Sequence, residues 1–281
     1  MNKYILLGAE KQAAVSAAQA WPDRHFIFFT DQPIIDGWDL PNVEIFKVDK
    51  PCYPQSDDFE SDHHLPLCPR WINEKSKYPL NKFRRFELLT VMNYLSQEFS
   101  DIILPVYDQP PKNEDWIRKG NLFHHPDEAL TGKPLDVISS YKAYECGTVF
   151  QKYLDGTTDY VVTGNRTNSR SISLAVFLIH RQAFGREDFL FAGETVYHPL
   201  MIDKSVAALS AMNHLGFFTF NWIEQKNNYF ISSFRPVPKG VFGVFTKSGI
   251  DCLSISEPGV HIARSGIKYI ATPTYSSYKR L

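Results

Sequence analysis

The stretch GFFTFNWIEQKNNYFISSFRPVPKG, Gly216–Gly240, decides how the second half of this chain folds. It holds two aromatic-rich segments, GFFTFNWIE and NYFISSF, with a short polar run between them. Segments rich in aromatic and β-branched residues, bounded by polar turn residues, are typical of neighbouring strands in a hairpin. The second segment ends in Arg235 and a proline-bracketed turn, so its Ser-Ser-Phe-Arg end is a candidate functional feature.

More strand patterns lie before this hairpin. The segments LDVISSY, TVFQKYL, DYVVTGN and SISLAVFLIHR each predict a strand, and Asp155-Gly156 predicts a turn between the second and the third. One helix interrupts the strands, and we expect it to begin after an N-cap at Asp203 and to end before Gly216. The second half of the chain is therefore expected to be α+β, with an antiparallel sheet.

The first half has a different pattern. An apolar strand, KYILLGA, is followed by the alanine-rich helical segment EKQAAVSAAQAW and by the strands HFIFFTD and VEIFKVD. A strand, a helix and a strand with short connections predict a βαβ unit with parallel strands, which is an α/β arrangement. A polar connection, Lys50–Lys82, follows. An amphipathic helix over Asn81–Ser100 and a strand, DIILPVYD, then close this unit.

Composition and charge exclude several classes of protein. The chain has 281 residues, 43% of them hydrophobic, which is enough for a sizeable core, and its formal net charge is −1. A nearly neutral chain gives no reason to expect nucleic acid or an anionic membrane as a partner. No stretch approaches the ~20 apolar residues of a membrane span, and the four cysteines form no CxxC pair. We therefore expect a soluble protein of the reducing cytoplasm.

A zinc site is an alternative interpretation of part of the polar connection. Cys52, His63, His64 and Cys68 are all possible zinc ligands. Their spacing matches no common structural pattern, because such sites place ligands in closely spaced pairs. A polar loop is the favoured interpretation.

Several segments resemble the ATP-grasp superfamily. FQKYLDGTTDYVV, Phe150–Val162, is similar to the hinge strand of that superfamily, and the hairpin of Gly216–Gly240 is similar to its metal-binding strand pair. KSGIDCL, Lys247–Leu253, is similar to a motif that often follows this pair. The resemblance implies an N-terminal Rossmann-like parallel βαβ domain, residues 1–110, and an ATP-grasp-like antiparallel sheet domain, residues 111–281, whose small subdomain is short.

The resemblance also implies where ATP binds. It places the edge of the adenine on the hinge residues Gln151, Lys152, Tyr153 and Leu154, and an acid near the ribose at Asp159. A backbone strand between apolar walls is what an adenine pocket needs.

Basic residues at four positions are candidates for contacts with phosphate or substrate. Arg235 takes the position of the arginine that holds phosphate or substrate in the superfamily, and Arg170 or Arg181 is expected to add a second basic contact. Lys142, which precedes the hinge, is the favoured phosphate lysine among those between Gln109 and the hinge. Arg166 is expected to be a solvated turn residue.

The metal positions implied by the resemblance depart from the superfamily pattern. ATP-grasp enzymes bind Mg²⁺ between an acid on one strand and a Glu-x-Asn pair on the next. Here the first position is Asn221, and the pair falls on Ile231 and Ser233. Glu224 is the remaining acid, although a residue three positions from Asn221 along a strand points to the opposite face. Asn221, Ser233 and Glu224 are therefore the candidate metal residues, with ATP and Mg²⁺ as the implied cofactors.

Three functions follow as expectations. The first is an ATP-dependent ligase that activates a small-molecule carboxylate as an acyl phosphate for attack by an amine or a similar nucleophile. The second is a catalytically degenerate ATP-grasp protein that binds a nucleotide or a partner. The third is a different α/β enzyme, such as a sugar-nucleotide transferase. The altered metal positions are what separates the first from the second.

Overall fold

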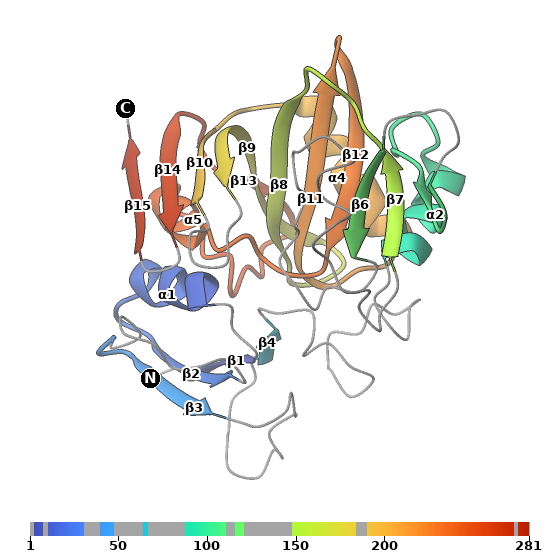
Figure 1. The fold of residues 1–281 in the computed structure, drawn as a ribbon. Helices are drawn as coiled ribbons and strands as arrows, with labels where there is room; N and C mark the ends of the chain where they lie inside the picture. Colours follow the sequence, from blue (N-terminus) through green and yellow to red (C-terminus); the bar gives the residue numbers. More distant parts are fainter. Residues whose placement is uncertain are drawn as a thin grey trace.

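The computed structural model of the chain describes residues 3–7, 11–30, 40–47, 64–66, 88–110, 116–120, 148–183, 190–272 and 275–280. Within these residues the chain forms a parallel N-terminal sheet, a large central sheet and a three-stranded sheet beside it (Figure 1). The predicted strand LDVISSY and Lys142 lie outside the described residues, as do Cys52, His63 and Cys68.

The N-terminal sheet is parallel, as the sequence predicts. Its strands are β1 (Lys3–Leu7), β2 (His25–Thr30), β3 (Val43–Lys47) and β4 (His64–Pro66), in the order β3-β2-β1-β4. Helix α1 (Lys11–Ala20) connects β1 to β2. The central strand β2 buries Phe26, Ile27 and Phe28, because strands inside a parallel sheet are covered on both faces. Strand β4 was not predicted: the polar connection contributes it as an edge strand beside β1.

The central sheet has the strand order β12-β11-β8-β9-β10-β14-β15, and β13 pairs with β9. Its strands are β8 (Thr158–Arg166), β9 (Ser171–Ala183), β10 (Leu190–Thr195), β11 (Gly216–Gln225), β12 (Asn228–Arg235), β13 (Gly259–Ile262), β14 (Ile267–Thr272) and β15 (Tyr275–Arg280). All pairs along the main path are antiparallel, and only β13 pairs parallel. The predicted hairpin of β11 and β12 is confirmed.

The three-stranded sheet has the order β5-β7-β6, with strands β5 (Val106–Tyr107), β6 (Trp116–Gly120) and β7 (Thr148–Lys152). Asp155 and Gly156 form the predicted turn after β7, where Gly156 has a positive φ of 65°. The turn does not close a hairpin, because β7 belongs to this sheet and β8 to the central sheet. Strand β7 is therefore a junction between two sheets.

Helices cover both faces of the central sheet. Helices α1 and α5 (Phe242–Lys247) pack on one face, in a core that includes Phe28, Phe177 and Phe217. Helices α2 (Leu88–Glu98) and α4 (Pro199–Ala211) pack on the other, and Figure 1 shows α1 between the N-terminal sheet and the C-terminal strands. None of the described helices is long and apolar enough to cross a bilayer.

Helix α4 begins earlier than the sequence predicts. Its N-cap is His198, whose Nδ1 accepts a hydrogen bond from the Met201 amide (3.4 Å), and Pro199 occupies the first turn. Proline is favoured there because its missing N–H is not needed. The prediction of an N-cap at Asp203 was wrong, because this residue lies inside the helix, and Gly216 already begins β11.

Arg166 is buried and caps the C-terminal end of α4, contrary to the expectation of a solvated turn residue. Its side chain is 5% exposed. Nη1 donates to the carbonyl oxygens of Leu209 (3.0 Å) and His214 (3.2 Å), and Nη2 donates to that of Ser169 (3.2 Å). The last carbonyls of a helix lack intrahelical donors and carry partial negative charge. A guanidinium supplies both the missing N–H donors and a positive charge.

We predict that Arg166→Met lowers the free energy of unfolding by about 2–3 kcal/mol, because the buried carbonyls of Leu209 and His214 lose a charged donor. Chemical denaturation of the purified protein measures the change. Arg170→Met is the matched control, since Arg170 is exposed in the following turn, and such a substitution should change stability by about 0.5 kcal/mol or less. Equal effects of the two substitutions would contradict the role of Arg166.

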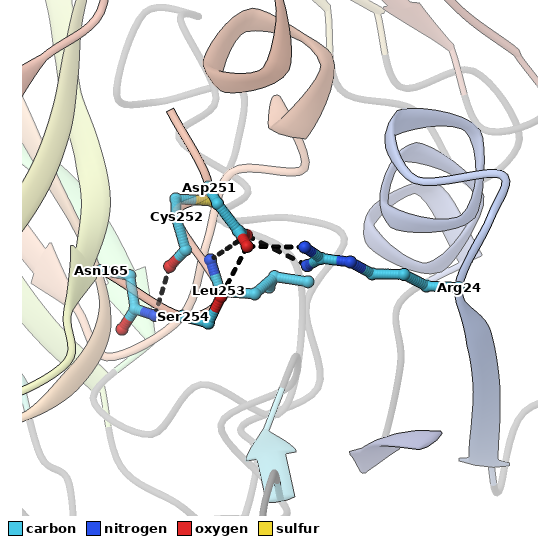
Figure 2. Close-up of polar contacts among 6 residues, drawn as sticks. All are labelled: Arg24, Asn165, Asp251, Cys252, Leu253 and Ser254. Carbon is cyan, nitrogen blue, oxygen red and sulfur yellow. Dashed lines mark hydrogen bonds and ion pairs between the residues drawn. The ribbon is translucent and has the colours of Figure 1, made fainter. Parts of the chain in front are cut away.

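An ion pair joins the N-terminal sheet to the segment after α5 (Figure 2). Arg24, which precedes β2, donates from Nη1 and Nη2 to the two carboxylate oxygens of Asp251, at 3.0 and 2.6 Å. Asp251 also accepts from the Leu253 amide (3.2 Å) and the Ser254 hydroxyl (2.5 Å). A bidentate ion pair of this kind fixes the orientation of the two side chains as well as the distance between them.

The contacts of Asp251 make this ion pair sensitive to acid. Burial raises the pKa of the Asp251 carboxyl, but hydrogen bonds from Arg24 and Ser254 and the charge of Arg24 outweigh burial and hold the pKa below its ordinary value. The pKa of Asp251 is lower in the folded protein than in the unfolded chain. The ion pair therefore stabilises the folded protein fully above the unfolded pKa of about 3.9, and this stabilisation is lost as the pH falls through the folded-state pKa.

We predict that Arg24→Met lowers the free energy of unfolding by about 1 kcal/mol at neutral pH, since the partners are partly exposed. Denaturation between pH 7 and about pH 3 should show this difference shrinking as Asp251 takes up a proton. Arg264→Met is the control, because Arg264 is exposed and makes no ion pair with a residue that the structure describes. A difference that does not change with pH would count against the ion pair.

Candidate functional site

Strand β7 carries the hinge residues that the sequence predicts for adenine. Gln151 lies between Val106 of β5 and Ile117 of β6, so β7 is the central strand of its sheet. Lys152 is the last residue of the strand, and Tyr153 and Leu154 follow it outside the strand. Lys152 is exposed, whereas Tyr153 and Leu154 are half-buried.

Gln151 itself holds the hinge to the central sheet. Its side chain is fully buried, and Nε2 donates to the carbonyl oxygens of Leu104 (2.9 Å) and Ser232 (3.1 Å). Ser232 belongs to β12, so a single amide connects the strand predicted to carry adenine with the strand that ends in Arg235. The backbone supports this junction, because the Leu104 amide donates to the Ile231 carbonyl (3.0 Å) and the Ile231 amide donates to the Ile102 carbonyl (2.6 Å).

One face of β8, β11 and β12 carries a row of polar side chains, which we call the polar face: Thr163, Thr219, Asn221, Ser233 and Arg235. Thr219 lies opposite both Thr163 and Arg235, and Asn221 lies opposite Ser233. Opposite residues of an antiparallel pair point to the same face. The side chains interact accordingly.

Hydrogen bonds connect neighbouring residues of the polar face. The hydroxyls of Thr163 and Thr219 are 2.9 Å apart, and Asn221 Nδ2 donates to Ser233 Oγ at 2.6 Å. Thr219 Oγ1 also donates to the carbonyl of Val237 (2.7 Å), and the Lys239 amide donates to Thr163 Oγ1 (3.3 Å). The turn after Arg235 therefore covers the two threonines.

The covered and open parts of the polar face differ in exposure. Thr163, Thr219 and Ser233 are each 1% exposed, whereas Asn221 is half-buried. Asp159, the predicted ribose acid, lies two residues before Val161, which is opposite Asn221. Asp159 is exposed and shares this face. Asn221 and Asp159 thus mark the side of the polar face that a ligand could reach.

A bulge in β12 separates the two positions that the resemblance pairs as Glu-x-Asn. Ser233 lies opposite Asn221, but Ile231 lies opposite Trp222, so Ser232 is an extra residue in β12. As a result Ile231 points away from Ser233. Ile231 is fully buried in the core beneath α2 and α4. The bulge thus removes Ile231 from the polar face altogether.

Glu224 also lies on the far face, as its spacing from Asn221 predicts. Its carboxylate accepts hydrogen bonds from the hydroxyls of Tyr160 (2.9 Å) and Tyr229 (3.3 Å), and both tyrosines pack against the core beneath α4. Burial, followed by the hydrogen bond and the charge of Glu224, raises the pKa of Tyr160 to about 12. Glu224 therefore bonds to two tyrosines on the face of the sheet opposite Asn221.

The described residues of the polar face do not fit Mg²⁺. This ion requires about six oxygen ligands in octahedral geometry, usually with at least one carboxylate. Asn221 directs an N–H at Ser233, Ile231 has no ligand atom, and Glu224 is on the opposite face. No group of three histidine, cysteine or acidic residues among the described residues could hold a metal ion.

The other predicted basic residues lie in different places. Arg235 is half-buried on the polar face. Arg170 is exposed in the turn after β8, so the length of that strand separates it from Asp159. Arg181 lies in β9, opposite Ala192 of β10. Of the predicted basic residues, the described structure brings only Arg235 into the row with Asn221 and Ser233.

The sequence contained a signal for the polar face that our prediction did not use. Polar residues alternate with apolar ones in VTGN of β8, FTFN of β11 and SFR of β12. Alternation with a period of two places such residues on one face of a strand. Thr163 and Thr219 could have been found in this way, whereas the buried contacts of Gln151 join segments far apart in the chain.

Comparison with solved structures identifies the fold. The chain matches an N5-carboxyaminoimidazole synthetase from Staphylococcus aureus complexed with ADP, with a TM-score of 0.65 at 11% identity, over 96% of this chain and 81% of that one. An L-amino acid ligase from Bacillus licheniformis matches with a TM-score of 0.61 at 12% identity, over 96% and 79%. A D-alanine–D-alanine ligase from Bacillus anthracis matches with a TM-score of 0.54 at 8% identity, over 86% and 88%.

These likenesses confirm that the chain has an ATP-grasp fold. No protein-family model matches the sequence, and no curated protein matches it either. At these identities the solved structures establish the fold alone.

We predict that Gln151→Leu lowers the free energy of unfolding by about 2–3 kcal/mol, because two buried carbonyls lose their donor. Hydrogen exchange should also speed up at the Leu104 and Ile231 amides, which bond across the same junction. Gln225→Leu is the control, since its amide makes one exposed contact with the Asp155 carbonyl. Unchanged exchange at Leu104 and Ile231 would show that Gln151 does not hold the junction.

Proposed function

We propose that this chain is an adenine-nucleotide-binding protein with the ATP-grasp fold. The backbone of Lys152, Tyr153 and Leu154 would hold the base, and Arg235 would hold phosphate oxygens. The observation that carries the proposal is the bond from Gln151 to the Ser232 carbonyl, which makes the end of the hinge and the strand of Arg235 one unit. A base and its phosphates need two such elements at a fixed separation.

Asp159 and the polar face extend the proposed site. An exposed carboxylate at the start of β8 suits the hydroxyls of a ribose, because a carboxylate accepts two hydrogen bonds. Asn221 would lie between this carboxylate and Arg235. We also propose the two-domain division of the sequence prediction, with a Rossmann-like domain within residues 1–110. Helix α2 and residues 102–107 would then cross between the domains, because they pack on β12 and α4.

ATP-dependent ligation is the second candidate function, and Arg235 together with the likeness to two ligases and a synthetase favours it. In that reaction a carboxylate oxygen attacks the terminal phosphorus of ATP, giving an acyl phosphate and ADP. An amine then attacks the acyl carbon and releases phosphate. The chain's residues would position and neutralise the reacting groups. Because the described residues do not fit Mg²⁺, we assign no step to a metal, and this favours the nucleotide-binding form.

We predict that millimolar ATP or ADP raises the thermal unfolding temperature of the protein. A ligand at 100 times its Kd that binds only the native state adds about 2.7 kcal/mol, a clearly measurable shift. AMP should give a smaller shift, because it offers Arg235 fewer phosphate oxygens. Arg235→Met should reduce the shift with ATP, and Arg264→Met should leave it unchanged.

The outcomes separate the two candidate functions. A nucleotide shift without ADP release in the presence of candidate carboxylates and amines supports the binding protein. ADP release that depends on both a carboxylate and an amine supports the ligase. If neither nucleotide shifts the unfolding temperature, the nucleotide proposal is wrong.

A further inference from the structure

We infer that Gln225 is a positioning residue of the proposed nucleotide site, and that it makes this site distinguish adenine from guanine. The inference rests on the proposed nucleotide function and assigns the selection of the base to a side chain of the β11–β12 hairpin. Three features of the described residues support it: the anchored ends of the hinge, the fixed turn that follows the hinge, and the backbone groups between the anchors.

The hinge is held at both of its ends by the same hairpin. At the start, Gln151 Nε2 donates to the carbonyl oxygen of Ser232 in β12 (3.1 Å). At the end, Gln225 Nε2 of β11 donates to the carbonyl oxygen of Asp155 (2.8 Å), the residue that follows Leu154. The residues between these two anchors therefore connect two points of one hairpin, and both points constrain their path.

The peptide group between Asp155 and Gly156 is fixed from two sides. Its carbonyl oxygen accepts the bond from Gln225, and its N–H donates to Oδ1 of Asp155 (2.8 Å). Gly156 has a φ of 65°, which glycine adopts without the strain of other residues. Because Asp155 and Gly156 are exposed, packing holds this peptide group only weakly, and the bond from Gln225 ties it to the central sheet.

The position of Gln225 follows from local structure and needs no bound ligand. Gln225 lies opposite Asn228, and the two-residue turn between them consists of Lys226 and Asn227. These turn residues have φ values of 50° and 64°, as a tight hairpin turn of type I′ requires. A turn of this type fixes the register of its two strands. Gln225 is therefore placed before a nucleotide arrives, which favours selective binding.

The backbone of Tyr153 and Leu154 carries the groups that would select the base. Both residues are half-buried, and neither backbone forms a hydrogen bond with another residue that the structure describes. Adenine presents the N6 donor where guanine presents the O6 acceptor. A backbone group of fixed orientation pairs with one of these bases and is left unpaired by the other, and this is a strong source of selectivity.

Nucleotide binding by variants of Gln225 tests the inference. The probes are ATP and GTP, titrated calorimetrically in the same buffer into the wild-type protein, Gln225→Met and Gln225→Lys. We expect the wild-type protein to bind ATP about tenfold or more tightly than GTP. Gln225→Met keeps the length of the side chain but removes the donor, so the preference should fall to about threefold or less. Gln225→Lys keeps a donor and should retain most of the preference.

Two controls separate positioning from charge and from stability. Asn228→Lys adds the same charge at an exposed position opposite Gln225, so it should leave the ratio of the two Kd values unchanged. Gln225→Met should leave the free energy of unfolding almost unchanged, since the lost bond is exposed. An unchanged ratio in Gln225→Met would overturn the inference. So would an equal loss of the preference in Asn228→Lys.

Hydrogen exchange gives a second readout of the fixed turn. The Gly156 amide should exchange faster in Gln225→Met, whereas the Leu104 and Ile231 amides, at the other end of the hinge, should not change. Unchanged exchange at Gly156 would contradict the role of Gln225. The wild-type titration distinguishes two failures. Equal binding of ATP and GTP overturns the inference and leaves the nucleotide function standing, whereas binding of neither overturns both.

Discussion

The central sheet is buried on both faces, and each polar side chain that its strands turn inward must find a hydrogen-bond partner there. This constraint organises the molecule. An unsatisfied buried amide or hydroxyl costs about 1–3 kcal/mol, so Thr163, Thr219, Asn221 and Ser233 bond to one another or to the turn after Arg235. The same requirement places Arg166 against the end of α4 and Gln151 against β12. The polar face is therefore a consequence of how the sheet is covered.

The polar contacts continue from the sheet to the N-terminal unit. Asn165, on the same face of β8 as Thr163, donates to the carbonyl of Cys252 (2.7 Å), and Asp251 beside it holds Arg24 (Figure 2). The segment Lys247–Leu253 thus connects the two sheets in this chain. A ligand on the polar face would lie between elements that Arg24 and Gln151 hold in place from two sides.

The fold of this chain and the chemistry of its polar face depend on different residues. The apolar strands and the helices above them determine the fold, which is shared with the compared synthetase and the two compared ligases at sequence identities of 8–12%. The site depends on a few polar residues at strand ends. Substitutions there change the chemistry at little cost to packing, so the fold by itself does not decide between a ligase and a nucleotide-binding protein.

The sequence alone determined the features that depend on local pattern. Continuous apolar strands around an alanine-rich helix predicted the parallel unit, and aromatic alternation predicted the β11–β12 hairpin and the opposite orientations of Asn221 and Glu224. The tertiary structure alone decided the bulge at Ser232, the role of Gln151 and the burial of Arg166. Each depends on a partner distant in sequence, such as Leu104 for Gln151 and the end of α4 for Arg166. A period-two pattern shows which residues of a strand share a face. A single inserted residue, however, moves every side chain beyond it to the opposite face. Only packing against distant segments decides where that residue lies.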